Sequence, residues 1–493
     1  MPPMSPDQAP APKGRGWLRV LIAFVVAFDV AAFFQWADGA FQCEFGGHPA
    51  EAENYLAGVR ARDSLRHAPD READDSGSSA ASRPREKWSF PAVLGGWMSV
   101  FGTSRIAVLL FMTTLAAGTT ALIFGAVRRE LGDWAAAVAS LLWLCAPAVR
   151  ESYETILPEQ SGAFILTGAA LLWARMMDEG DPLRAAACKW IGSLALLGGG
   201  LVLVSAFAVA TEIAPGDPRA AWAFLRECVS VPGIAVAAFA IVGMGMRLHS
   251  EVQMNAARVA LAALVAGVLF ARWMKGGTGD VRVLAVATPA LAMLAVRGAV
   301  ALAGNVGLHA ALVAELPRRR ALWLFLLLLL SLPPDLLSPR AKDWRGFGPV
   351  ASALIEESHG PSRVLVVSDA LGEGMFLSEL AMQDRARRIT AERGSETLVE
   401  PRNADAVDPG QRFLDDDHLV AHLISGHFQY IVLDSAPAME VRAGYRDQIR
   451  RVVEDNAHSF WPIFFSPFVR DGETMGHPLQ IFRVMQPNGA ELR

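Results

Sequence analysis

The stretch HPAEAENYLAGVRARDSL, residues 48–65, follows the first long apolar run and has a pattern that an ordinary membrane loop lacks. Pro49 suits the first helical position, where its missing N–H costs nothing, and acids in the first turn suit the positive end of the helix dipole. We therefore predict a helix that starts at His48 or Pro49 and continues to Leu65. Residues spaced three or four apart share one face of a helix, and here they form a stripe of Glu51, Tyr55, Gly58 or Val59, Arg62 and Leu65. Glu53, Arg60 and Asp63 lie on other faces.

This stripe carries a carboxylate, a phenol and a guanidinium. The combination suits an anionic lipid head group and leaves one carboxylate for proton transfer. The alternative is an interfacial amphipathic helix whose charged side chains simply face water. Both interpretations place the helix at the outer surface of a membrane.

The rest of the chain has the composition of a membrane protein. Of its 493 residues, 52% are hydrophobic and 19% are charged, against the roughly 25% charged residues of soluble domains. Apolar runs that approach the roughly 20 residues needed to cross hydrocarbon predict about nine transmembrane helices. The runs are 17–36, 105–127, 133–149, 160–175, 189–211, 229–246, 256–272, 281–303 and 319–338. Arg297 interrupts the eighth run, which indicates either a functional cavity or a span that ends earlier.

Positively charged short loops, which stay on the cytoplasmic side, predict the orientation. Arg15 and Arg19 flank the start of the first run, and Arg128 and Arg129 follow the second. The pattern predicts a cytoplasmic tail over 1–16, a transmembrane domain over 17–338 with a first outer loop over 37–104, and an extracytoplasmic domain over 339–493. The first run is expected to remain as an anchor, because no convincing cleavage site follows it.

Two segments outside the apolar runs differ sharply in character. Residues 66–87 are charged and rich in serine and bury too little apolar surface to order themselves, so we expect a flexible flap. After residue 339, RVLVVSD, YIVLDS and LQIFRVMQ are typical of strands, and GMFLSELAMQD and EVRAGYRDQIRRVVED of helices. FWPIFFSPF, 460–468, is expected to pack on the membrane surface or on its own sheet. The predicted fold is mainly α, a polytopic membrane protein whose outer loop carries surface helices, with a C-terminal α/β soluble domain.

Several classes of function and ligand are disfavoured. A net charge of -5 provides no basic field for nucleic acid. The four cysteines have no metal-binding spacing, and the histidines near residues 418–427 match no known zinc motif, so we predict no metal and no cofactor. The glycines of Ser368–Glu379 lack G-x-G-x-x-G spacing, which favours a tight turn over a nucleotide site.

The segment from His48 to Leu65 resembles a pattern of bacterial membrane glycosyltransferases of the GT-C type, specifically family 39. This group contains the dolichyl-phosphate-mannose protein mannosyltransferases and the aminoarabinose transferase of lipid A. In that pattern an HPDEA element after the first span leads into HY, then G, then RD. The matching residues here are His48, Pro49, Glu51, Ala52, Tyr55, Gly58, Arg62 and Asp63. Trp97 to Ala117 also looks like the family's entry into the second span, and the order of spans, outer loop and outer domain is similar over most of the chain.

The chain departs from the family pattern at two places. The first acid of the Asp-Glu pair, the expected general base or sugar-positioning carboxylate, is Ala50 here, which leaves Glu51. Before the second span, the family's lysine and its His-Tyr or Trp-Pro-Pro stretch are replaced by RPREKWSFPAV, 83–93, in which Lys87 supplies positive charge.

The resemblance implies transfer of a sugar from a polyprenyl-phosphate-linked donor to a glycan, lipid or protein acceptor outside the bacterial inner membrane. A carboxylate deprotonates the acceptor hydroxyl as it attacks the anomeric carbon, and arginine or lysine stabilises the leaving lipid phosphate. The candidate catalytic residues are Glu51 and Glu53. The candidate substrate-binding residues are His48, Tyr55, Arg62, Asp63, Lys87 and Glu159.

Three alternatives remain open at this point. The segment 149–162, with Glu151, Glu154 and Glu159, is either part of the site or a solvated loop. Loss of the acid at Ala50 favours a catalytically degenerate relative that binds or helps to assemble lipid-linked glycans. A transporter would predict paired broken helices and internal repeats, and the two halves of the sequence show no convincing repeat.

Overall fold

A computed structural model describes eleven segments of the chain and four isolated positions between 261 and 268. The segments are 16–45, 49–66, 90–178, 234–245, 285–305, 316–331, 345–399, 412–413, 415–435, 444–469 and 477–485. The chain divides into two compact units. We call them the helical unit (Met1–Gln35, Arg83–Ser89 and Leu110–Pro339) and the mixed unit (Trp36–Ser82, Phe90–Leu109 and Arg340–Arg493).

The helical unit contains the long apolar helices of the chain. In chain order its helices are α1 (Gly16–Ala37), α4 (Arg105–Leu131), α5 (Asp133–Leu144), α6 (Pro147–Glu154), α7 (Pro158–Asp178), α10 (Ile234–Gly245), α12 (Thr288–Asn305) and α13 (Leu316–Ser331). The last two residues of α1 and the first five of α4 belong to the mixed unit. Within the described segments, three helices are long and apolar enough to cross a membrane, Gly16–Ala37, Arg105–Leu131 and Ala285–Ala303. They coincide with three of the predicted runs. The predicted runs 189–211 and 256–272 lie outside the described residues, apart from the isolated positions.

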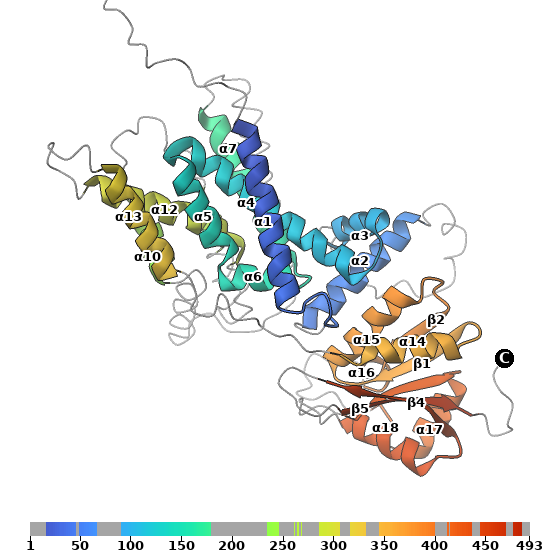
Figure 1. Cartoon of the computed structure of the whole chain (residues 1–493). Coiled ribbons are helices and arrows are strands. Elements are labelled where there is room, and N and C mark those ends of the chain that lie inside the picture. Colours follow the sequence, from blue (N-terminus) through green and yellow to red (C-terminus); the bar gives the residue numbers. More distant parts are fainter. Residues whose placement is uncertain are drawn as a thin grey trace, which may run out of the picture. The chain divides into compact units, whose positions relative to one another are not determined.

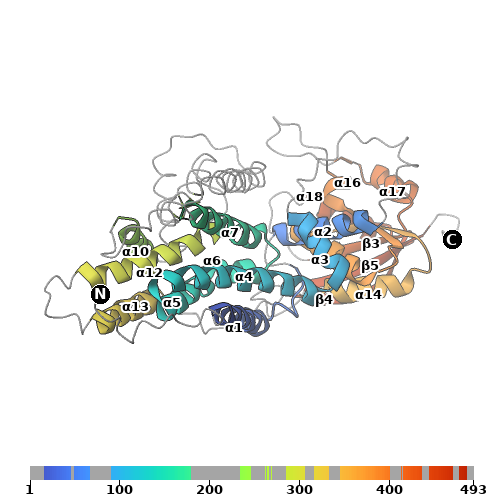
Figure 2. The ribbon, with the colours of Figure 1, turned by 90° about the horizontal axis from the view of Figure 1, so that it is seen from above.

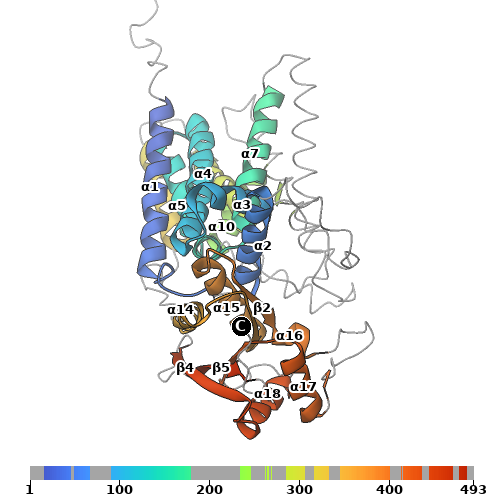
Figure 3. The same cartoon turned by 90° about the vertical axis from the view of Figure 1, so that its right-hand side faces the viewer.

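Charged side chains join the ends of α1, α4 and α5, which run alongside one another (Figure 3). Arg128, in the last turn of α4, donates to the Gly16 carbonyl at 2.9 Å and to the Asp133 carboxylate at 2.6 Å. Arg19 of α1 forms an ion pair with the same carboxylate. Arg19 and Arg128 therefore lie at the same end of this bundle, the end that the positive-charge pattern predicts to be cytoplasmic.

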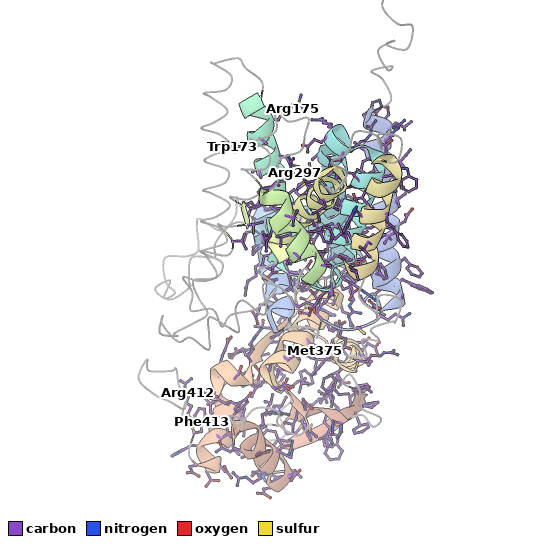
Figure 4. The ribbon with its side chains drawn as sticks, turned by 90° about the vertical axis from the view of Figure 1, so that its left-hand side faces the viewer. Trp173, Arg175, Arg297, Met375, Arg412 and Phe413 are labelled. Carbon is purple, nitrogen blue, oxygen red and sulfur yellow. The ribbon has the colours of Figure 1, made fainter. Side chains whose placement is uncertain are left out.

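Helix α12 is rich in alanine and contacts α10 closely. Gly243 and Gly298 let the two backbones meet, because a Cβ on Gly243 would lie 2.0 Å from the Leu294 carbonyl oxygen and one on Gly298 would lie 2.0 Å from that of Phe239. Small residues serve the same purpose in membrane helix pairs. Arg297, labelled in Figure 4, lies within α12 and not at its end, and its guanidinium is 3.4 Å from the Glu130 carboxylate.

The mixed unit is built on a five-stranded sheet of order β2-β1-β3-β5-β4. The strands are β1 (Ser362–Val367), β2 (Ile389–Arg393), β3 (Tyr430–Asp434), β4 (Phe460–Phe468) and β5 (His477–Val484). β1 pairs in parallel with both β2 and β3, whereas β5 is antiparallel to β3 and β4. The three predicted strands are confirmed as β1, β3 and β5. β4 carries Pro462 and Pro467 and lies at the sheet edge, where a missing N–H is tolerated.

Helices cover both faces of this sheet (Figure 1). They are α14 (Phe347–Glu357), α15 (Ala370–Gln383), α16 (Gly394–Thr397), α17 (Asp416–Ser425) and α18 (Gly444–Asp455). On one face, Phe347 of α14 and Phe376 of α15 pack on Val364 and Val366, and Met375 (Figure 4) belongs to this core. α17 and α18 build a second core on the other face. Alternate residues of β1 enter the two cores, so both of its faces are apolar, as expected for a central parallel strand.

Two helices of the first outer loop also belong to the mixed unit, α2 (Pro49–Arg66) and α3 (Phe90–Phe101). The sequence-based division placed this loop in the transmembrane domain, whereas contacts group α2 and α3 with residues 340–493. α2 and α3 lie against each other (Figure 2), and a Cβ on Gly95 would lie 2.8 Å from the Arg62 backbone nitrogen. Glycine at position 95 is therefore needed for this close crossing. The predicted helix 48–65 is confirmed to within a residue at each end.

Candidate functional site

The α2 helix has two covered faces. Tyr55 and Val59, with 0% and 4% of their surface exposed, lie on the predicted stripe, and Gly58 of that stripe faces Leu94 of α3. Glu51, another member of the stripe, is 4% exposed. Glu53 forms an ion pair with a residue of the α/β domain, as described below. The helix is thus built into the protein, and its charges do not simply face water.

Tyr55 is the second residue of the stripe, after Glu51. Its hydroxyl donates to the carbonyl oxygen of Thr103, in the turn between α3 and α4, at 2.9 Å. Its ring lies 5.0 Å, centroid to centroid, from that of Phe45. Burial raises the pKa of the phenol above its ordinary value. The hydroxyl of this predicted substrate-binding residue therefore joins α2 to the turn that leads into α4.

Arg62 and Asp63 form a pair at the end of α2. The Arg62 Nε donates to Asp63 Oδ1 at 2.9 Å. The other oxygen, Asp63 Oδ2, is 3.5 Å from the Nε of Arg387, in the connection between α15 and β2. The structure thus brings these two predicted substrate-binding residues together, with a second guanidinium beside them.

The two predicted catalytic carboxylates lie in different surroundings. Glu53, with 49% of its side chain exposed, forms an ion pair with Arg393 at the end of β2. Glu51 lies two residues earlier and is buried. Glu51 is buried and lies at the position that matches the family's motif, so it is the better candidate for a general base.

A pocket of about 560 Å³ lies between α2, α15 and β2, and we call it the α2 pocket. Leu377, Leu380 and Ile389 contribute apolar surface, and Glu53 and Asp63 contribute carboxylates. The remaining lining residues are Leu56, Val59, Arg60, Ala381, Asp384, Arg387, Ala391, Glu392, Arg393, Glu396 and Thr397. Three arginines and five acids surround it, so its chemistry suits a small polar group that both accepts and donates hydrogen bonds.

Glu44, just after the first candidate span, caps α14 of the α/β domain. Its Oε1 accepts from the backbone nitrogens of Gly346 at 2.9 Å and Gly348 at 2.7 Å, and its Oε2 accepts from that of Phe347 at 3.0 Å. Burial, with a smaller contribution from Glu379, raises the pKa of Glu44 to about 7, although the three N–H groups oppose the shift. A single acid after an apolar run gave no signal from which this role was predictable.

A second ionic contact joins the start of α4 to the same domain. Arg105 forms an ion pair with Glu379 of α15, and its guanidinium lies 5.4 Å from the centre of the Phe45 ring. Burial raises the pKa of Glu379, and the neighbouring Arg105 opposes the shift. Residues 44 and 105, which follow one candidate span and begin the next, are therefore both bonded to the α14–α15 face.

The helical unit holds its own polar cluster, at α6 and the start of α7. Arg150 Nε lies 3.0 Å from Glu154 Oε1, and its guanidinium lies 4.5 Å from the centre of the Phe34 ring. Ser152 donates to Gln160 at 2.7 Å. Glu154 and Glu159 are 3% and 5% exposed. Of the predicted segment 149–162, residues 149–154 and 158–162 are helical and two of its three acids are buried, so the alternative of a solvated loop is wrong.

Two predicted binding residues, His48 and Lys87, and residues 67–87 of the predicted flap lie outside the described residues. Among the residues that are described, no group of three or more His, Cys, Asp or Glu is arranged to hold a metal ion. Cys43 and Cys145 are buried.

Comparison with known proteins finds similarity among solved structures. No protein-family model matches the sequence, and a search of curated proteins finds no match. Among solved structures, the chain is similar to the one described as the crystal structure of ArnT from Cupriavidus metallidurans in the apo state. The identity is 12%, the match covers 94% of this chain and 98% of that chain, and the TM-score is 0.46. At this identity, the roles of individual residues rest on the geometry of this chain.

Proposed function

We propose that this chain is an integral-membrane glycosyltransferase of the GT-C type. It transfers a sugar from a polyprenyl-phosphate-linked donor to a glycan, lipid or protein acceptor on the extracytoplasmic face of a bacterial inner membrane. The proposal rests on the position, the sequence motif and the burial of α2. This helix follows the first candidate span, matches the family's motif at Glu51, Tyr55, Gly58, Arg62 and Asp63, and holds Glu51 in a buried position.

Glu51 is the general base of the proposed reaction. Its carboxylate takes the proton of the acceptor hydroxyl as the oxygen attacks the anomeric carbon, and the bond from that carbon to the lipid phosphate breaks. A positioned general base contributes about 10²- to 10⁴-fold in rate. Positive side chains stabilise the negative charge that develops on the leaving phosphate, and Arg62 and Lys87 are the candidates.

The polar cluster of α6 and α7 is the second component of the proposal. Glu159 is an acid at the start of a largely apolar helix, and Arg150 and Glu154 form a buried pair one helix earlier. Ionisable groups within a membrane domain are costly to bury and mark functional sites by default. We assign Glu159 to substrate binding.

The orientation is also part of the proposal. The shared end of α1 and α4, with Arg19 and Arg128, faces the cytoplasm, because positive charge accumulates on that side. The α/β domain is then extracytoplasmic, on the side where the sugar is transferred.

One specific observation favours a second candidate function, binding or assembly of lipid-linked glycans without catalysis. The family's first acid is Ala50 here, and Glu53 is engaged by Arg393. The motif on α2 therefore has one carboxylate where the family has two.

Reconstituted protein distinguishes the two candidates. Full-length protein in lipid nanodiscs is incubated with a panel of radiolabelled polyprenyl-phosphate sugars, and release or transfer of the label is measured. The variants are Glu51→Gln and Ala50→Asp, with the exposed Glu454→Gln of α18 as the control. Transfer by wild type and by the control, but not by Glu51→Gln, supports the enzyme. Transfer by Ala50→Asp alone, or donor binding with no transfer by any variant, refutes catalysis and supports the binding protein.

A further inference from the structure

Two ion pairs join α2 to one short segment of the α/β domain. Glu53 pairs with Arg393, 340 residues later, and Asp63 pairs with Arg387 at 3.5 Å. Arg387 lies two residues before β2, the edge strand next to β1, and Arg393 is the last residue of that strand. The two acids lie near the start and the end of α2, so the contacts resist tilting as well as displacement of the helix.

A close backbone approach lies beside the first ion pair. A Cβ on Gly374 of α15 would lie 2.9 Å from the Cβ of Ala52, which is fully buried. Real Cβ atoms essentially never come so close, so any larger residue at position 374 moves α2 or α15. Ala52 follows Glu51 directly. The contact with α15 therefore sets the position of the backbone next to the proposed base.

The chain just before α2 is fixed as well. Glu44 accepts three backbone hydrogen bonds at the N-terminal end of α14. A carboxylate at this end of a helix also interacts favourably with the helix dipole. The chain from residue 44 to residue 63 is therefore bonded to the α/β domain at its beginning, its middle and its end.

The backbone at Arg387 is held in a strained conformation. Its φ is 53°, in the left-handed region that residues other than glycine rarely adopt. Its amide donates to the Asp384 carbonyl and its Nη1 donates to the Ala381 carbonyl at 2.8 Å. Such strain persists where the surroundings determine it, and it is common where a side chain must be aimed. Here the conformation accompanies a guanidinium directed at Asp63.

We propose that Arg393 and Arg387 are positioning residues, through which the α/β domain holds α2 and thereby sets the place of Glu51. This gives the α/β domain a definite part in the reaction. The effect on catalysis rests on the proposed function, whereas the restraint on α2 does not. Neither arginine needs to touch a substrate, since each acts through the helix.

Hydrogen exchange in the full-length protein in nanodiscs tests the restraint directly. The variants are Arg393→Met, Arg387→Met and their combination, with Arg393→Lys and Arg387→Lys as conservative partners. Arg385→Met, an exposed arginine of the same connection, is the matched control. We expect the amides of α2 to exchange about tenfold faster in the double methionine variant than in wild type. In the lysine variants and the control, the exchange rates of α2 should stay close to those of wild type. Exchange in β1 and β3 stays unchanged, which shows that the α/β domain is folded.

Added salt gives a second readout, because partly exposed ion pairs are screened. Salt accelerates exchange of α2 in wild type and has a smaller effect in the double variant. If α2 exchanges at the wild-type rate in the double variant, the restraint is refuted, whatever the activity.

Sugar transfer by the same preparations tests the positioning role. We expect kcat to fall about tenfold in the double methionine variant and to recover in the lysine variants, with the KM for the donor nearly unchanged. If α2 loosens while kcat is unchanged, the positioning role is wrong. If wild type transfers no sugar with any donor, the proposed function fails, and the exchange rates still decide whether the arginines restrain α2.

Discussion

Replacing Glu373 by glutamine should change how the stability of the α/β domain depends on pH. Glu373 lies on α15, has no exposed surface, and accepts from the Ser395 backbone nitrogen at 3.0 Å and from the Tyr445 hydroxyl at 3.2 Å. Burial raises its pKa from 4.5 to about 7, and the hydrogen bonds and nearby Arg393 oppose the shift. The Ser395 hydroxyl donates to the other oxygen, Oε2. Glutamine has almost the same shape, keeps Oε1 for the first two donors and places an amide group opposite the Ser395 hydroxyl, which can accept as well as donate. The substitution therefore removes the titration with little change in packing.

The sign of the effect follows from proton binding. Between pH 4.5 and pH 7 the folded protein holds a proton on Glu373 that the unfolded chain has released. The stabilising contribution of this group is therefore complete below pH 4.5 and is lost as the pH rises through 7. One pKa unit corresponds to 1.36 kcal/mol, so the shift amounts to about 3 kcal/mol, an upper value. Glu373→Gln should therefore gain stability relative to wild type as the pH rises from 5 to 8, by about 2 kcal/mol.

Pulse proteolysis in urea measures this free energy of unfolding on the full-length protein in detergent. Glu44 and Glu379 also have raised pKa values and titrate in both proteins, so the quantity to follow is the difference between variant and wild type. Glu454→Gln, at an exposed carboxylate on α18, is the control for the loss of one negative charge. If the Glu373→Gln difference does not vary from pH 5 to pH 8, Glu373 is not a buried neutral acid and the reasoning is refuted.

Three further substitutions test the packing around the site. Gly95→Ala places a methyl group against the backbone of α2, and we expect a loss of about 1–3 kcal/mol in unfolding free energy, measured by urea denaturation, with no loss if α3 simply shifts. Tyr55→Phe removes the bond to the Thr103 carbonyl and should cost about 1 kcal/mol in the same assay, while donor affinity stays at the wild-type value; weakened donor binding would instead make the phenol a ligand. Arg150→Met leaves the Glu154 carboxylate without its guanidinium inside the helical unit and should lower the thermal midpoint in nanodiscs by several degrees, with partial recovery in Arg150→Met/Glu154→Gln; an unchanged midpoint would contradict a buried pair.

The parts of the fold that follow from local pattern were predictable from the sequence. The apolar runs at 17–36 and 105–127 became α1 and α4, because hydrophobic length alone identifies such helices. The apolar segments around 364 and 431 became strands of a sheet covered on both faces. Proline and acids at the start of α2 fixed its first residue to within one position.

β2 and β4 were not predicted as strands. β2 reads ITAER, a polar segment without alternation, and it is a strand because β1 offers it a parallel partner. β4 contains two prolines and a register shift between Pro462 and Phe464, and such features belong to edges of sheets. In both cases the structure depends on pairing with strands elsewhere in the chain, and the local sequence does not reveal these partners.

In the candidate site, too, the partners of the charged side chains were not predictable from the local sequence. From the sequence, the charges of α2 had only a lipid head group or water to meet, since a helical pattern does not reveal a partner 340 residues away. The structure supplies that partner in Arg393 and changes what each acid can do. Glu53 is a surface residue bonded to Arg393, and Glu51, which is buried and matches the family's motif, is the base that we propose.

The long stretch of chain between α2 and the α/β domain adds little to the entropic cost of bringing the two together. Loop-closure entropy grows only with the logarithm of loop length, so a loop of about 340 residues costs about 0.6 kcal/mol more than one of half that length. Membrane spans reduce the freedom of the intervening chain still further. Glu44 after the first candidate span and Arg105 at the start of the next both bond to the α14–α15 face, and Glu53 and Asp63 then need only local adjustment to reach their arginines. The α/β domain can therefore receive α2 as an additional helix of one of its layers, which explains how a loop between two spans is part of a domain encoded at the other end of the chain.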